Sequence, residues 1–328
     1  MNLMKAIQVN VPGGEFELVM REIPEPMEGQ IRLKVLACGV CHGDAMVKNG
    51  GDYPGLEYPR IPGHEIIGVI EKTGPDVSEF ETGQRVGVGW PAGITYDGGF
   101  AEYMITSAQE LVLIPKELNE AEAAPLLCAG VTTFEALKNS GAKPGDVIAI
   151  QGIGGLGHLA IQYARKMGFK TVSISRGADK KELAERLGTH VYIDTESADV
   201  IKELQKLGGA KAILATAPNK EAISDLINGL SLDGKLMLIA GVEEPLQIFS
   251  GQLIAGRRSI QGWRPPIGSE AGSARKNMID FSLLTDVHPM IETFSLEQID
   301  LAYEKMLNSK IRFRAVLVPG KVANSRSL

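Results

Sequence analysis

The sequence has few cysteines, few aromatic residues and no long apolar run. Three cysteines occur in 328 residues, too few for the disulfide framework of a small secreted protein. No segment approaches the ~18 consecutive apolar residues of a membrane span, and the N-terminus alternates like a strand where a signal peptide would be apolar. The net charge of −6 is mild and there is no Lys/Arg block, which argues against binding to nucleic acid or a membrane surface. We therefore expect a cytoplasmic protein with a small-molecule partner, and neither a nucleic-acid nor a membrane partner.

Two patterns of local sequence predict two domains. Up to about residue 120, short alternating segments such as IRLKVLA and EIIGVIEKTG are separated by Gly/Pro turns, which predicts a β-rich, barrel-like domain. From about residue 125, strand-like runs alternate with helical stretches, which predicts βαβ units in a doubly wound parallel sheet. We predict a β-rich catalytic domain at residues 1–125 and 266–328, and a nucleotide-binding domain at residues 126–265.

A glycine motif stands between a predicted strand and a predicted helix. Gly152, Gly154 and Gly157 form a GxGxxG. The first glycine allows a tight turn, the second lets the backbone approach a pyrophosphate, and the third allows close helix packing. The N-terminus of the helix supplies N–H groups for phosphates. Together with Gly155 and Leu156, the motif predicts a dinucleotide site; a glycine-rich turn without a ligand is the alternative.

The end of the next strand bears on the choice of cofactor. NAD sites usually carry an acid about 20 residues after the motif, where it binds the ribose hydroxyls. Here Ser175 and Arg176 occupy that place, with Lys180 and Lys181 close behind. A hydroxyl with cations suits a 2′-phosphate, so NADP is favoured over NAD. The alternative is that the cations are solvated and that Asp179 merely caps the next helix.

Cysteine and histidine residues in three separate segments match the ligand preferences of zinc. The segments contain Cys38, Cys41 and His42, then His64, then Cys128, and two thiolates with one imidazole would suit Zn²⁺ and leave a fourth position open for water or substrate. A four-cysteine structural site is impossible with three cysteines. The alternatives are buried apolar cysteines, a structural histidine, and a Cys38/Cys41 redox pair, although that pair lies outside the βαβ context of redox motifs.

Several segments resemble one family. GVCHGD, PGHE and LLCAGVTTFEAL are similar, in order, to the three zinc-ligand motifs of zinc-containing medium-chain alcohol dehydrogenases. The resemblance continues through GIGGLGHLAIQYA to RFRAVLVP and covers essentially the whole chain. Each motif is weakly specific alone, and the ordered set is specific. The resemblance implies α/β architecture plus a β-rich part: a GroES-like, β-barrel-type catalytic domain and a Rossmann cofactor domain with a doubly wound parallel sheet.

The resemblance also implies a ligand set. Cys41, His64 and Cys128 would hold one catalytic zinc per subunit. Glu65 would lie behind the metal and act as an exchangeable ligand. Asp44 would orient the imidazole of His64, because a ligating histidine needs a partner on its other nitrogen.

Other residues acquire roles toward the cofactor and the substrate through the same resemblance. His42 and Arg314 would reach the pyrophosphate, and Thr132 would lie near the nicotinamide. Trp90 would line the substrate pocket. Ordinary packing is the alternative for Trp90 and Trp263, and solvation is the alternative for Arg314.

Two departures from the family pattern bear on activity. Many relatives carry Ser or Thr where Gly43 stands, and that hydroxyl begins the proton relay; some carry His where Met46 stands. Proton removal would then use water, His42 or another route, and general acid–base help is commonly worth about 10²–10⁴-fold in rate. The chain also passes directly from Gly93 to Ile94, where many relatives carry a lobe with a structural zinc. We therefore expect one zinc per subunit.

The implied activity is zinc-dependent alcohol dehydrogenation. Zinc would acidify a bound alcohol, hydride would pass to NADP or NAD, and aldehyde reduction would be the reverse reaction, with primary alcohols favoured. Two alternatives remain: a zinc-free medium-chain quinone or enoyl reductase, and a catalytically weakened NADP-binding relative. A homodimer or homotetramer is the expected assembly.

Overall fold

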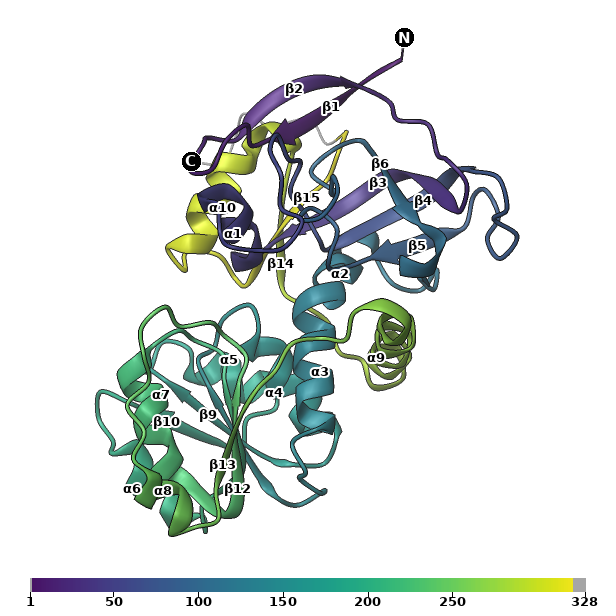
Figure 1. Cartoon of the computed structure of the whole chain (residues 1–328). Helices are drawn as coiled ribbons and strands as arrows, with labels where there is room; N and C mark the ends of the chain where they lie inside the picture. Colours follow the sequence, from purple (N-terminus) through teal and green to yellow (C-terminus); the bar gives the residue numbers. More distant parts are fainter. Residues whose placement is uncertain (1, 321–328) are drawn as a thin grey trace. The chain divides into compact units, whose positions relative to one another are not determined.

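The computed structural model describes residues 2–320 and divides into two compact units. Unit 1 comprises residues 1–128 and 266–328, and unit 2 comprises residues 129–265. The predicted boundary after residue 125 differs from the observed one after residue 128. Helical residues run across this point from 120 to 138, so no turn signal marks it in the sequence. Figure 1 shows the elements of both units.

Unit 1 is built around one long strand, β3 (Gln30–Val40). Along one edge β3 pairs antiparallel with β4 (Ile66–Thr73). Along the other edge it pairs with β6 (Tyr103–Ser107) and then with β15 (Arg314–Leu317), so a strand near the end of the described chain lies beside one near its start (Figure 1). Five strands complete the sheets of this unit within the described residues: β5 (Arg85–Val88), β7 (Val112–Leu113) and β14 (Ile291–Phe294) in the seven-stranded sheet, and β1 (Leu3–Gln8) with β2 (Glu17–Glu22) as a separate antiparallel pair.

The core of unit 1 comes from the apolar residues of these strands. Ile31 and Leu33 of β3 are fully buried with Ile66 and Ile70 of β4 and with Phe100. Burial of each such side chain stabilises the fold by about 1.5–3 kcal/mol. Among residues 2–320, no helix has both the length and the apolar composition to cross a membrane. The helices of unit 1 are α1 (His42–Asn49), α2 (Glu120–Pro125), α9 (Ala271–Thr285) and α10 (Ile299–Leu307).

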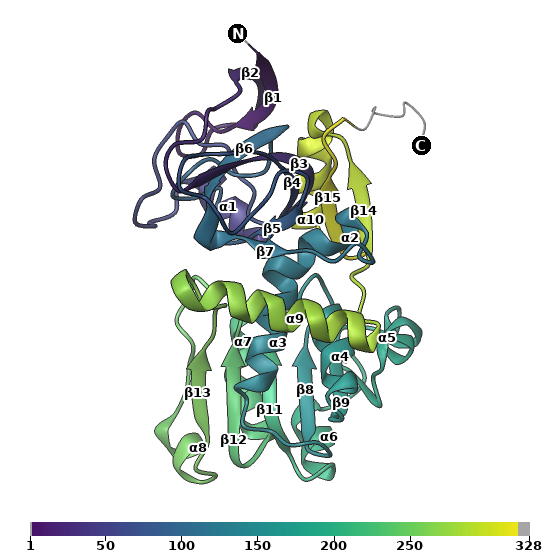
Figure 2. The ribbon, with the colours of Figure 1, turned by 90° about the vertical axis from the view of Figure 1, so that its right-hand side faces the viewer.

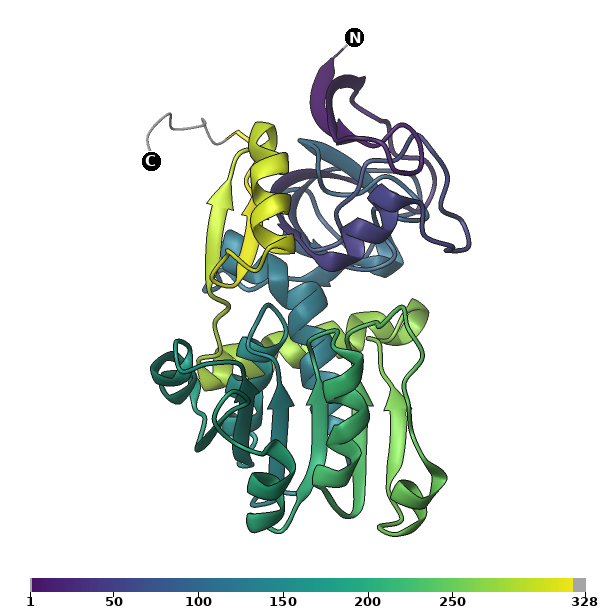
Figure 3. The same cartoon turned by 90° about the vertical axis from the view of Figure 1, so that its left-hand side faces the viewer.

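Unit 2 contains a six-stranded parallel sheet in the order β10-β9-β8-β11-β12-β13. Numbered along the unit this order is 3-2-1-4-5-6, the order of the Rossmann fold, so the predicted doubly wound parallel sheet is confirmed. Helices α3 and α4 cover one face (Figure 2), and α6 and α7 cover the other (Figure 3). The strands are β8 (Val147–Gln151), β9 (Lys170–Ser175), β10 (Val191–Asp194), β11 (Ala210–Ala215), β12 (Leu230–Leu238) and β13 (Ser259–Gly262). The helices are α3 (Val131–Lys138), α4 (Gly157–Lys166), α5 (Lys181–Leu187), α6 (Val200–Lys206), α7 (Lys220–Leu226) and α8 (Ser250–Ile254).

Among the α-helices and β-strands of the described residues, six have no counterpart in the sequence-based prediction: α1, α2, α3, α8, β2 and β13. Most residues of β2 are exposed, so the alternation that identifies a half-buried strand is absent. Strand β13 has four residues, none of them fully buried. Helix α1 has eight residues and buries only Asp44 and Val47, which is too short and too polar for a recognisable helical stripe.

A matched pair of leucines on β12 tests the assignment of the unit 2 core. Leu236 is fully buried, whereas Leu232 on the same strand is 57% exposed. Leu236→Ala is expected to lower the free energy of unfolding by about 2–5 kcal/mol, because it leaves a cavity. Leu232→Ala should change it by less than about 0.5 kcal/mol. Urea denaturation followed by circular dichroism measures both, and equal effects would contradict this packing.

Candidate metal centre and cofactor site

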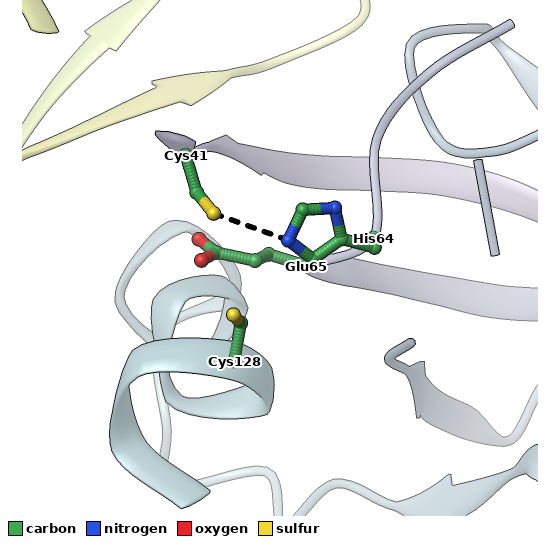
Figure 4. A group of neighbouring side chains, drawn as sticks. All are labelled: Cys41, His64, Glu65 and Cys128. Carbon is green, nitrogen blue, oxygen red and sulfur yellow. Dashed lines mark hydrogen bonds between the residues drawn. The ribbon is translucent and has the colours of Figure 1, made fainter. Parts of the chain in front are cut away.

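Four side chains with metal-binding atoms converge in unit 1 (Figure 4). Cys41 follows β3, His64 and Glu65 precede β4, and Cys128 lies on a π-helical turn at residues 126–130. Their donor atoms all lie within 4.8 Å of one another, and Cys41 Sγ is 3.1 Å from His64 Nε2. Ligands at about 2.0–2.3 Å from a tetrahedral ion lie roughly 3.5 Å apart. The spacing therefore suits a single metal ion, and the structure brings together residues predicted from three separate segments.

A buried carboxylate connects the two segments that carry Cys41 and His64. Cys41 is the N-cap of α1, where its Sγ accepts a hydrogen bond from Gly43 N at 3.1 Å. Asp44 Oδ2 accepts from Cys41 N at 2.9 Å, which completes a capping box. The other oxygen, Oδ1, accepts from Gly63 N and lies 3.2 Å from His64 Nδ1. Asp44 thus holds the imidazole so that Nε2 points toward Cys41.

The ionisation of these groups favours a cation among them. A hydrogen bond from Cys128 lowers the pKa of Cys41 well below its usual range, and the same bond raises that of Cys128. Burial alone would lower the pKa of His64, but the negative charges of Cys41 and Asp44 outweigh burial and raise it. A bound divalent cation would hold both cysteines as thiolates, because metal-bound cysteine is deprotonated.

Glu65 and Arg314 form a buried ion pair at the same centre. Arg314 Nη2 donates to Glu65 Oε1, and both side chains are almost completely buried. Burial raises the pKa of Glu65 to about 7, against the opposing effect of Arg314. Gly39 makes room for this carboxylate, because a Cβ there would lie 1.8 Å from Glu65 Oε2. The pyrophosphate contact predicted for Arg314 stays a prediction; the observed partner of Arg314 is Glu65.

Trp90 borders the metal-binding atoms. Its ring packs edge-on against that of His64, with centroids 5.2 Å apart and planes at 77°. The indole N–H donates to the hydroxyl of Tyr53 at 2.9 Å. Gly43 lies at the same place: a Cβ there would be 2.8 Å from His64 Cε1 and 3.3 Å from Trp90 Cζ3. The two rings thus occupy the space that a side chain at position 43 would need.

Three further residues singled out from the sequence do not belong to the group of converging donors. His42 is exposed at the start of α1. Thr132 is buried on α3 in unit 2. Cys38 is fully buried, its thiol is 3.6 Å from Gly39 O, and it does not belong to the group of converging donors.

The glycine motif forms the turn between β8 and α4 in unit 2. Gly152 has φ +93°, and a Cβ there would lie 2.7 Å from Ala217 Cβ. A Cβ on Gly157, the first residue of α4, would lie 1.9 Å from Gly152 O. At Gly154 a Cβ would meet no atom within 4 Å, so the backbone here faces open space. Two of the glycines therefore serve chain packing, and the third leaves the turn open to a ligand. Gly155 and Leu156, both half-buried, complete the turn.

The segment after β9 carries the residues predicted to select the cofactor. Ser175 ends β9, and the side chain of Arg176 is 85% exposed. Lys180 Nζ donates to Ile153 O at 3.0 Å, which brings a cation to the glycine turn. Two carboxylates also lie here: Glu196 Oε1 is 4.0 Å from Arg176 Nε, and Asp194 Oδ1 accepts a hydrogen bond from Gly177 N at 2.8 Å. Sequence reasoning missed Glu196 because it follows a different strand, β10.

Two other residues at these sites had no sequence signal. Tyr53 lies in a loop without a motif, and only the fold brings its hydroxyl to Trp90. Arg275 lies on α9, far along the chain, and donates to the carbonyl of Trp90 at 2.8 Å. A buried arginine on a predicted helix cannot be told from a solvated one without the tertiary structure.

Comparisons with known proteins agree with this geometry. The sequence profile of the alcohol dehydrogenase GroES-like domain matches residues 27–116, and that of zinc-binding dehydrogenases matches residues 155–274. Alcohol dehydrogenase patD of Penicillium expansum is 39% identical, over 89% of this chain and 91% of that protein. An alcohol dehydrogenase of Geobacillus stearothermophilus is 35% identical, over 96% of this chain and 98% of its own length.

A solved structure supports the fold. The alcohol dehydrogenase of the archaeon Aeropyrum pernix has a TM-score of 0.86 and 24% identity, over 96% of this chain and 100% of that one. The match includes both the GroES-like and the Rossmann parts, as the sequence resemblance implied. The chain therefore belongs to the zinc-type medium-chain alcohol dehydrogenase family and is an oxidoreductase that acts on alcohols.

Proposed function

We propose that the protein is a zinc-dependent alcohol dehydrogenase and aldehyde reductase with one catalytic zinc per subunit, a preference for NADP(H) over NAD(H), and primary alcohols as substrates. The observation that carries the proposal is the convergence of Cys41, His64 and Cys128, whose donor atoms lie with that of Glu65 within 4.8 Å of one another. When bound there, zinc supplies Lewis-acid polarisation of an alcohol oxygen. In this proposal unit 1 is the catalytic domain and unit 2 the cofactor domain, in a homodimer or homotetramer.

The donor set fits zinc for physical reasons. Two sulfur atoms and one imidazole nitrogen are borderline-soft ligands, and three protein ligands leave a position for substrate. Asp44 keeps His64 Nε2 directed toward Cys41, as a ligating histidine requires. The buried Glu65 carboxylate is balanced by Arg314, so it can stay close to the centre without an unpaired charge.

The proton of the alcohol must leave by a route that does not include a side chain at position 43. Gly43 has no hydroxyl, and His64 and Trp90 fill the space beside it. His42 is exposed one residue away, so its imidazole is in contact with solvent. We therefore propose that the proton leaves through water or His42.

The cofactor preference is supported by charge in unit 2. The nicotinamide accepts or donates the hydride, and the glycine turn before α4 would bind the pyrophosphate. Ser175, Arg176 and Lys180 offer a hydroxyl and two cations for a 2′-phosphate. Glu196 opposes this preference, because its carboxylate lies beside Arg176.

The substrate proposal rests on Trp90 and Tyr53. Their rings pack edge to face, with centroids 5.3 Å apart, and Trp90 also contacts His64. An aromatic wall beside the ligands favours an apolar chain and leaves less room for a second carbon substituent at the reacting carbon. Primary alcohols and aldehydes meet both conditions.

Removal of one thiolate tests the metal site. The purified protein is expected to hold about one zinc per subunit, and Cys41→Ala should lose both the zinc and aldehyde reduction, because two ligands hold the ion poorly. Cys38→Ala is the control, since Cys38 is equally buried but is not one of the converging donors. Mass spectrometry of the metal measures both variants.

Two other outcomes would contradict this proposal. A zinc-free protein that still reduces an enone or a quinone would be a zinc-free reductase. A protein that binds zinc and NADPH without turnover would be a catalytically weakened relative.

Arg176→Ala tests the cofactor preference. The KM for NADPH is expected to rise about tenfold or more, because a charge-assisted hydrogen bond to phosphate is lost, while the KM for NADH stays within about twofold. Arg186→Ala serves as the matched control, since Arg186 is an arginine of α5 with a 66% exposed side chain that pairs with Glu182. Equal changes for both cofactors would contradict 2′-phosphate recognition by Arg176.

Gly43→Ser tests whether a hydroxyl relay can be restored. The structure predicts a loss: the new Cβ would lie 2.8 Å from His64 Cε1, so the imidazole must move, and kcat should fall by about tenfold or more. Gly43→Ala adds the same Cβ without the hydroxyl, and its kcat should fall by the same factor. Stopped-flow and steady-state kinetics on one aldehyde compare the two; a serine variant faster than the wild type would contradict the steric argument.

A further inference from the structure

Arg275 on α9 (Figure 2) is a buried cation that the proposed chemistry does not use. Its side chain is 3% exposed. Burial lowers the pKa of its guanidinium, and the neighbouring Glu110 and Tyr96 act in the opposite direction. A buried charge is costly unless every donor finds an acceptor, so the partners of Arg275 indicate what the residue does.

Those partners are main-chain carbonyls in the two segments that α9 covers. Nη2 donates to Trp90 O at 2.8 Å, and Nη1 donates to Glu110 O at 3.0 Å. The carboxylate of Glu110 is near, with Oε2 3.7 Å from Nη1, but this oxygen forms no hydrogen bond within the described residues. Arg275 therefore connects α9 to two backbone segments that lie 165 and 185 positions away in the sequence.

The backbone before Trp90 is shaped to receive this guanidinium. A Cβ on Gly89 would lie 2.9 Å from both Nε and Nη2 of Arg275, and 2.9 Å from Leu127 O. Any larger residue at position 89 would push the guanidinium away. The approach of Arg275 to Trp90 O thus depends on a glycine immediately before Trp90.

Trp90 is held at three points, of which Arg275 supplies one. The indole N–H is bound by Tyr53 and the ring edge rests on His64. The main-chain carbonyl is bound by Arg275. The first two contacts are made by the side chain of Trp90, whereas the third is made by its main chain.

We infer that Arg275 is a positioning residue that fixes the backbone of Trp90 and so holds the indole against His64 at the border of the substrate site. This inference rests on the proposed function, in which His64 binds the metal and Trp90 borders the substrate. An apolar residue of similar length would fill the same volume without the cost of a buried charge. The role that an apolar side chain could not fill is therefore to donate hydrogen bonds to the two carbonyls.

The chain offers a direct probe, because it contains two tryptophans, Trp90 in unit 1 and Trp263 in unit 2. In a Trp263→Phe background the emission reports Trp90 alone. Arg275→Met is expected to raise the acrylamide quenching constant of Trp90 roughly twofold or more, because the loosened segment opens to solvent. The matched control is Lys276→Met, which removes a 68% exposed cation from the next position of the same helix and should leave quenching unchanged.

Kinetics on the metal-loaded enzyme supply the second measurement. Arg275→Met should raise the KM for an aldehyde about three- to tenfold while kcat changes less. The rise should disappear in a Trp90→Ala background, where no indole remains to be positioned. Unchanged quenching together with an unchanged KM would overturn the inference.

Two further comparisons distinguish a failure of this inference from a folding defect and from a failure of the proposed function. If Arg275→Met does not fold, Arg275→Lys replaces it, since a lysine cannot bind both carbonyls in the same geometry. A quenching constant of Trp90 above that of the wild type then supports the inference. A quenching constant equal to that of the wild type overturns it. If the protein is not a zinc dehydrogenase, zinc content and turnover fail in the wild type itself. The quenching of Trp90 still responds to position 275 in that case.

Discussion

The candidate centre depends on the contacts that the carboxylate of Asp44 makes. It is fully buried and binds the main chain at Cys41 and Gly63 while it holds the ring of His64. One side chain thus caps a helix, joins two loops and orients an imidazole. A buried carboxylate is stable only where donors surround it, so the same bonds that satisfy Asp44 define the positions of two of the proposed metal ligands.

Strand pairing brings the remaining parts to this point. Strand β15, from the end of the described chain, pairs with the last residues of β3, and this register brings Arg314 beside Glu65. The π-helical turn at residues 126–130 then presents Cys128 to Cys41 and His64. Glycines at positions 39, 43 and 89 make room for the side chains of Glu65, His64 and Arg275, respectively. A Cβ at each glycine would collide with the corresponding side chain. Close packing at the centre therefore requires residues that lack a side chain.

The buried charged side chains around the centre each have a partner of opposite charge or a hydrogen-bond acceptor. Glu65 with Arg314 and Asp44 with His64 are paired side chains, whereas Arg275 is satisfied chiefly by carbonyls. Leaving any one of these groups unpaired is expected to cost several kcal/mol. In unit 2 the corresponding charges, Arg176 and Glu196, are exposed, where solvent screening makes their mutual attraction small. Glu196 accordingly holds the side chain of Arg176 only weakly.

The sequence by itself determined the features that depend on local pattern and spacing. These are the parallel sheet of unit 2, the glycine turn at 152–157, and the three separate segments that carry Cys41, His64 and Cys128. Elements α1, β2 and β13 were not predicted, because their residues lack a periodic apolar stripe. Tertiary structure alone decided that Arg314 pairs with Glu65, that Trp90 and His64 fill the space beside Gly43, and that Arg275 is buried against a carbonyl. These contacts join residues up to 249 positions apart, and the partner of a charge at such a separation is chosen by strand register and helix packing, which no local pattern encodes.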